Sequence, residues 1–112
     1  MSSRAWGPVL AWMVLIFIGS SIPAHKLPQV WVFSYDKVLH ALEYSILGGL
    51  TARAAGGRGA AVLAGALFAS IYGASDEFHQ LFVRGRNCDW HDWVADTVGG
   101  SVGALAVWVA KR

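Results

Sequence analysis

The sequence predicts an all-α integral membrane protein in which four transmembrane helices form an antiparallel bundle with a polar cluster near one membrane face. Composition is the first observation: 55% of the 112 residues are hydrophobic and 14% are charged, whereas about 25% of residues are charged in an ordinary soluble domain. The second observation is that the chain has four apolar stretches of helix length, and that ionisable residues fall inside or at the ends of three of them. An ionisable group at bilayer depth is costly, so it is kept where it is paired, hydrated or used.

The first apolar stretch, at about residues 5–22, begins after Arg4 and ends before Pro23, a residue that stops helices. As a helix it is about 27 Å long, close to the thickness of the hydrocarbon core of a bilayer. A secretory signal peptide is the competing interpretation, because a basic start and a short apolar core are typical of one. The core here is long, and Ile22-Pro23-Ala24 is a poor cleavage site, so a retained helix is expected.

The second and third stretches, at about residues 38–55 and 60–82, are expected to be antiparallel neighbours. The glycine-rich segment 56–59 between them allows a tight turn. The second stretch is polar in its first half, and the third becomes polar after Tyr72. Strands are not expected, because the apolar runs are too long and strands cross membranes only in closed barrels.

The fourth stretch, at about residues 93–110, carries Asp96 near its start and is small and apolar afterwards. In an antiparallel bundle made by one domain, residues 1–112, the second helix begins, the third ends and the fourth begins at the same membrane face. Polar residues occupy these three ends, and their convergence predicts a site. The alternative, in which polar helix ends simply lie in water, suits Glu77 and Asp92 best. The candidate catalytic residues are His40, Glu43, Asp76, Glu77, His79 and Asp96.

Helical spacing supports this site. Pairs of polar residues three or four apart share a helix face: His40 with Glu43, Asp76 with His79, and Asp92 with Asp96. Small residues also recur at every fourth position, in a pattern that lets membrane helices approach closely, within one chain or between copies in a homo-oligomer. These small-residue stripes are Ala41, Ser45 and Gly49; Ala61, Gly65, Ala69 and Gly73; and Ala95, Gly99 and Gly103.

The distribution of cations predicts that both termini are cytoplasmic and that the polar site faces outward, because cytoplasmic segments are richer in Lys and Arg. The side assigned to the cytoplasm has five cations and no acidic residue: Arg4, Arg53, Arg58, Lys111 and Arg112. The other side has four cations among acidic residues: Lys26, Lys37, Arg84 and Arg86. The chain is therefore expected to be a multi-pass protein of the plasma membrane.

Two arginines that flank Gly85 predict an anion-binding function. The planar guanidinium suits phosphate or carboxylate, and glycine allows a close backbone approach. The candidate substrate-binding residues are Lys37, Gln80, Arg84, Arg86 and Asp92. In this hypothesis His40 and His79 act as general acid and base, oriented by Glu43 and Asp76. The alternative is that Arg84 and Arg86 only neutralise Asp89 and Asp92.

Two segments resemble the signatures of the VanZ-like membrane proteins. The first is Asp36-Lys37-Val38-Leu39-His40 with Glu43-Tyr44 and Leu47-Gly48 after it. The second begins at Ser75-Asp76-Glu77 and continues through Gly85-Arg86, Asp92-Trp93 and Ala95-Asp96-Thr97 to Gly103. Asp96 departs from the family pattern, which often has asparagine there. The resemblance implies a four-helix protein of the bacterial inner membrane, in a family named for a factor that raises resistance to the glycopeptide teicoplanin.

The predicted function is binding or processing of an anionic, phosphorylated lipid or a lipid-linked cell-envelope precursor, with no cofactor or metal assigned. One rival is a proton-coupled transporter or flippase, although all the polar groups lie near one face. A second rival is a metal-dependent membrane enzyme, in which Asp76-x-x-His79 and His40-x-x-Glu43 supply the ligands. The nearby arginines would repel a cation.

Two further observations exclude functions. The net charge is +2 and the chain has no basic run, so nucleic acid is not an expected partner. The single cysteine, Cys88, excludes an internal disulfide and a metal site made of several cysteines.

Overall fold

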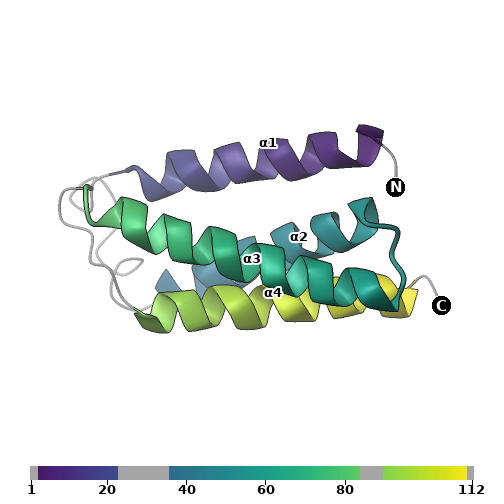
Figure 1. The fold of residues 1–112 in the computed structure, drawn as a ribbon. Coiled ribbons are helices and arrows are strands. Elements are labelled where there is room, and N and C mark those ends of the chain that lie inside the picture. The colour runs from purple at the N-terminus through teal and green to yellow at the C-terminus, as the bar shows by residue number, and fades with distance from the viewer. Residues whose placement is uncertain (1–2, 23–35, 84–89, 111–112) are drawn as a thin grey trace.

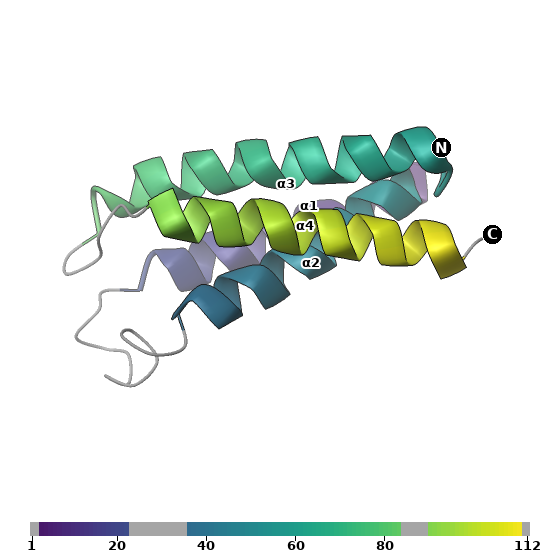
Figure 2. The ribbon, with the colours of Figure 1, turned by 90° about the horizontal axis from the view of Figure 1, so that it is seen from below.

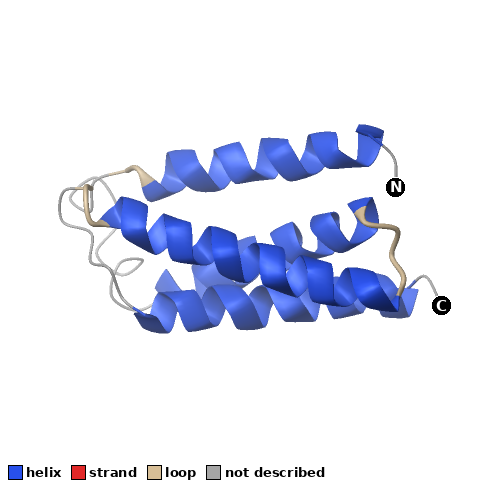
Figure 3. Cartoon of the chain, in the orientation of Figure 1, coloured by secondary structure: helices blue, strands red, loops and turns tan. Residues whose placement is uncertain are grey.

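The computed structural model describes residues 3–22, 36–83 and 90–110, and these residues form four helices (Figures 1 and 3). The helices are α1 (Ser3–Ser20), α2 (Asp36–Ala54), α3 (Gly59–Gln80) and α4 (Trp90–Ala110). No strand occurs within the described residues. The prediction of an all-α chain with four helices is therefore confirmed.

Successive helices run in opposite directions along one long axis (Figure 1). At one end of the bundle α1 ends, α2 begins, α3 ends and α4 begins, and we call this the polar end. The opposite end holds both ends of the chain and the turn from α2 to α3. This turn uses Gly56 and Gly57, whose φ angles of 108° and 71° suit glycine because it has no Cβ. The Gly57 amide donates to the Ala52 carbonyl at 2.8 Å, which caps the end of α2.

Small residues bring α2, α3 and α4 into close contact. A Cβ atom on Gly48 of α2 would overlap the backbone of Gly100 of α4, and one on Gly103 would overlap the backbone of Ser45. Glycine is therefore required for the helices to lie this close. In Figure 2, α4 lies between α2 and α3. The third stripe of small residues is buried along α3: Ala61, Gly65, Ala69 and Gly73.

Helix α1 packs along α2 and α3 and is tied to both by hydrogen bonds. The Trp12 indole donates to the Glu43 carbonyl on α2 at 2.8 Å. The Tyr72 hydroxyl of α3 donates to the Met13 carbonyl at 2.7 Å. Beside the second bond lies a groove with apolar walls, lined by Leu10, Met13, Val14, Phe17 and Tyr72.

The interior and exterior of the bundle have an unusual composition. Many large apolar side chains are exposed, among them Ile71, of which 68% is exposed, and Leu63, of which 62% is exposed. The buried set is instead rich in small and polar residues. Soluble monomers rarely expose apolar surface on this scale. Two helices, α3 and α4, are long and apolar enough to cross a membrane, whereas the apolar part of α1, Ala5–Ser20, is shorter.

Candidate functional site

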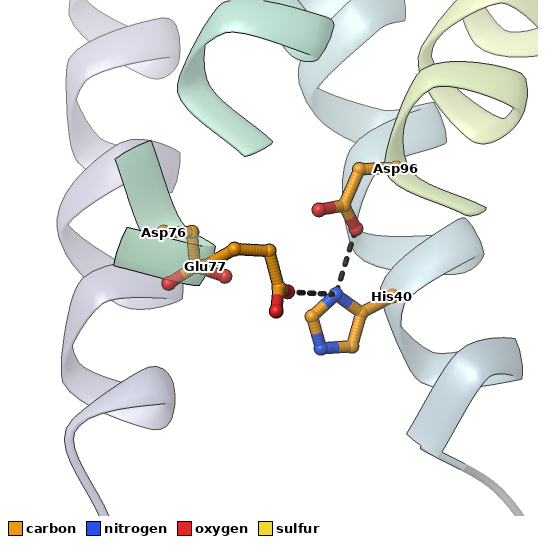
Figure 4. Close-up of side chains that lie close together, drawn as sticks. All are labelled: His40, Asp76, Glu77 and Asp96. Atoms are coloured by element: carbon orange, nitrogen blue, oxygen red, sulfur yellow. Dashed lines mark hydrogen bonds and ion pairs between the residues drawn. The ribbon is translucent and has the colours of Figure 1, made fainter. Parts of the chain in front are cut away.

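Four buried ionisable side chains meet near the polar end of the bundle (Figure 4). His40 comes from α2, Asp76 and Glu77 come from α3, and Asp96 comes from α4. Each offers one nitrogen or oxygen atom, and these four atoms lie within 4.8 Å of one another. We call these residues the acid–histidine cluster. Buried ionisable groups need partners or a ligand, so this arrangement is the strongest candidate site among the described residues.

His40 lies between carboxylates on both sides of its ring. Its Nδ1 is 2.7 Å from Asp96 Oδ1, a hydrogen bond that joins α2 to α4. The same nitrogen is 4.0 Å from Glu77 Oε1 on α3. On the other side of the ring, Nε2 is 4.0 Å from Asp92 Oδ2. These contacts fix the orientation of the ring, with Nδ1 directed into the cluster and Nε2 directed toward Asp92.

An ion pair holds Asp92 in this position. Lys37 Nζ donates to Asp92 Oδ1 at 3.0 Å. Lys37 precedes His40 by about one turn on α2, and Asp92 precedes Asp96 by about one turn on α4. The two helices are thus joined by two successive polar contacts. The Lys37 side chain is 52% exposed while that of Asp92 is 4% exposed, so the pair connects the buried cluster with the surface of the polar end.

Asp96 fits against α3 because Gly73 has no side chain. A Cβ on Gly73 would lie 2.7 Å from Asp96 Oδ2 and 2.8 Å from Asp96 Cβ. Gly73 stands one turn before Asp76 and Glu77, so the small-residue face of α3 leads directly into the cluster. Asp96 is fully buried, and its Oδ2 has no hydrogen-bond partner. Such an atom is rare in folded proteins and calls for an explanation.

The structure brings together four of the six predicted catalytic residues, and places the other two beside α1. His79 Nε2 is 2.8 Å from the Ser21 hydroxyl oxygen, and its ring stacks on Phe17 with centroids 4.5 Å apart. Glu43 is half-buried, and its backbone carbonyl accepts the bond from Trp12. His40 and Asp76 share the cluster with Asp96 and Glu77. The spacing in the sequence had instead predicted the pairs His40 with Glu43 and Asp76 with His79.

The predicted substrate-binding residues divide in a similar way. Lys37 and Asp92 form the ion pair beside the cluster, and Gln80 is buried at the end of α3. Arg84 and Arg86 lie outside the described residues.

Tyr44 is a further buried residue beside the cluster, and no role was predicted for it from the sequence. Its ring is parallel to that of His40, one turn earlier on α2, with centroids 6.3 Å apart. Tyr44 is fully buried, and its hydroxyl has no hydrogen-bond partner. The spacing of four residues from His40 was the signal that could have identified it.

Comparison with known proteins identifies one family. A family model described as VanZ/LLP1 matches residues 5–111, nearly the whole chain. No curated protein and no solved structure matches the chain significantly.

Proposed function

The chain belongs to the VanZ/LLP1 family, and we propose that it is a membrane protein that binds or processes a phosphorylated, anionic lipid at the polar end of its bundle. One observation carries the proposal: buried ionisable residues from three helices converge at one end of a bundle whose outer surface is apolar. A lipid has the same division between a polar head and an apolar tail. Phosphorylated, anionic lipids include the lipid-linked precursors of the cell envelope. Binding of such a precursor would connect the protein to glycopeptide resistance.

The exposed apolar side chains support a position in the membrane. They occur on all four helices, as in Phe17, Leu42, Leu67 and Val102. In water this surface would favour association, whereas lipid tails would cover it without loss. The proposed location is the bacterial inner membrane, with four crossings and both termini in the cytoplasm. The exposed residues Arg53 and Arg58 lie near the end opposite the cluster, as the positive-inside rule requires for this orientation.

The groove between α1 and α3 suits the tail of the lipid. Phe17, which lines this groove, also stacks on His79 near the polar end. A chain lying along Leu10, Val14 and Phe17 would therefore bring its head group close to His79 and Ser21. This geometry supports a role for His79 in contacting the lipid, distinct from that of the acid–histidine cluster.

The cluster supplies groups that can hold and move protons. His40 has one nitrogen on Asp96 and the other toward Asp92, and an imidazole oriented by a carboxylate is suited to general acid–base catalysis. The head group would contact Lys37 and, as the sequence predicts, Arg84 and Arg86. Transport of protons across the bundle is less well supported, because the buried ionisable side chains of the described residues all lie toward the polar end.

The proposal is tested by identifying the lipids that stay with the gently extracted protein, using mass spectrometry. We expect a phosphorylated lipid to be enriched over its share in the surrounding membrane. Lipid retained in the same proportions as the bulk membrane would contradict the proposal.

A matched pair of variants tests the head-group contact. Arg86→Lys keeps the charge but loses the bidentate guanidinium, so it should weaken binding of phosphatidic acid markedly. Arg53→Lys makes the same change at the other end of the bundle and should leave binding unchanged. Equal, near-wild-type affinity in the two variants would argue against a phosphate held by Arg86.

A further inference from the structure

We propose that the acid–histidine cluster binds one divalent transition-metal ion, with His40, Asp76, Glu77 and Asp96 as its ligands. One imidazole nitrogen and three carboxylate oxygens form a mixed donor set that suits Mn²⁺, Fe²⁺ or Zn²⁺. The site itself follows from the geometry of the cluster. Only its suggested role toward the lipid rests on the proposed function.

The spacing of the donor atoms fits one ion. Metal–ligand bonds of about 2.1 Å place opposite ligands about 4.2 Å apart. The four donor atoms lie within 4.8 Å of one another, so small rotations of the side chains bring them all into the coordination range. Because the ligands come from α2, α3 and α4, an ion would join three helices, as metal sites do in the cores of other helix bundles.

The Oδ2 atom of Asp96 is a second, independent observation that points to a cation. This side chain is completely buried, and Oδ2 has no hydrogen-bond partner. In Figure 4 it points toward the side of the cluster that holds Glu77. A buried carboxylate oxygen is costly unless a positive or hydrogen-bonding group meets it, and a metal ion would supply the missing partner. Oδ2 reaches this position against α3 because Gly73 has no side chain, since a Cβ there would lie 2.7 Å from Oδ2.

The arrangement of His40 resembles that of a metal-binding histidine, with an ion-pair contact of 4.0 Å to Asp92 where such a histidine has a hydrogen bond. Such a histidine coordinates through one ring nitrogen and directs the other toward a carboxylate, which fixes the ring. His40 Nδ1 faces the cluster, while Nε2 is 4.0 Å from Asp92 Oδ2. Asp92 is in turn held by Lys37 at 3.0 Å. The proton that Nδ1 and Asp96 Oδ1 share at 2.7 Å would leave when the ion binds, because metal ligands must be deprotonated, and Asp96 would hold the ion through both carboxylate oxygens.

A cation would also explain how an acidic site can receive an anionic lipid. The described part of the polar end holds four buried carboxylates, Asp76, Glu77, Asp92 and Asp96. Carboxylates repel a phosphate, whereas a divalent ion bound by carboxylates can also bind phosphate oxygens. The metal would then form a bridge between the cluster and the head group. The ligands predicted from the sequence were paired within α2 and within α3, whereas the proposed set spans three helices.

The direct test is metal binding by the full chain in detergent, after treatment with a chelator. We expect one equivalent of Mn²⁺ or Zn²⁺ to be retained after desalting, with a rise in the melting temperature, because a ligand of the folded state stabilises it. His40→Gln and Asp76→Asn should each lower metal affinity at least tenfold. Asp92→Asn should lower it by about 10–100-fold through loss of the support to His40.

The matched control is His91→Gln, which makes the same change at an exposed histidine of the polar end. It should bind metal as the wild type does. Circular dichroism without metal shows whether each variant keeps its helices. Wild-type protein that retains no metal, or equal affinity in His40→Gln and His91→Gln, would overturn the proposal.

Binding of phosphatidic acid, measured with and without the metal, separates this inference from the proposed function. Lipid binding that requires the metal supports the bridge. Metal binding without any lipid binding supports the site and contradicts the proposed function. Lipid binding by a protein that retains no metal overturns the metal site and leaves the proposed function intact.

Discussion

At the scale of single residues, the site depends on Asp96 and on the glycine that makes room for it. Asp96 contacts His40 through Oδ1, and its other face lies against Gly73. Both residues stand out in the sequence, one as a carboxylate in an apolar stretch and the other in a stripe of small residues. Their contact could not be predicted, because it depends on how α3 and α4 are rotated about their axes.

Gly73→Ala should therefore destabilise the protein by about 1–3 kcal/mol, the usual cost of adding a methyl group to a packed interior. The added Cβ would lie 2.7 Å from Asp96 Oδ2, and Asp96 would have to move. The control is Gly59→Ala at the start of α3, where the nearest atom is 3.9 Å away. Equilibrium unfolding in mixed micelles measures both. Equal stability of the two variants would contradict the close fit of Asp96.

The helices show how much of the arrangement follows from the sequence. The apolar stretches and the glycine-rich turn predicted four helices in antiparallel order, which places His40, Asp76, Glu77 and Asp96 at one end. The rotation of α3 about its axis could not be predicted from the sequence, because Asp76 and His79 are close enough in sequence to share a helix face. In the structure Asp76 points inward while His79 contacts Ser21 on the α1 side. Neighbouring helices, and not spacing alone, decide which polar residue enters the site.

The close packing of α2 against α4 can be tested by a substitution at Gly48. Gly48→Ala places a methyl group where the Gly100 backbone lies, so the two helices would have to separate. We expect a loss of stability and, because His40 and Asp96 lie on opposite sides of this interface, weaker metal binding as well. Gly19→Ala in α1 meets no atom within 4 Å and should change neither property. Metal binding that survives a measured loss of stability would show that the cluster does not depend on this crossing.

At the scale of the whole molecule, the helix order explains why one end is polar. The even number of helices returns the chain to the end where it began, so both ends of the chain lie opposite the polar end (Figure 1). Large apolar side chains cover the outside, and the small residues that let the helices approach leave space for the buried cluster. For the proposed position in a membrane, the distribution of cations predicts that the polar end faces outward.

This orientation is tested with cysteine labelling in intact cells. Cys88, which lies outside the described residues, precedes α4 in the sequence and should react with a reagent that does not cross the membrane. In a Cys88→Ser background, Arg58→Cys places the thiol in the turn between α2 and α3 and should react only after the membrane is made permeable. Arg58 is exposed in the fold, so protection of this cysteine would reflect the membrane and not burial. The reverse pattern would turn the site toward the cytoplasm, and its lipid would then have to come from the inner leaflet. Labelling of both positions from outside would contradict a bundle that crosses the membrane.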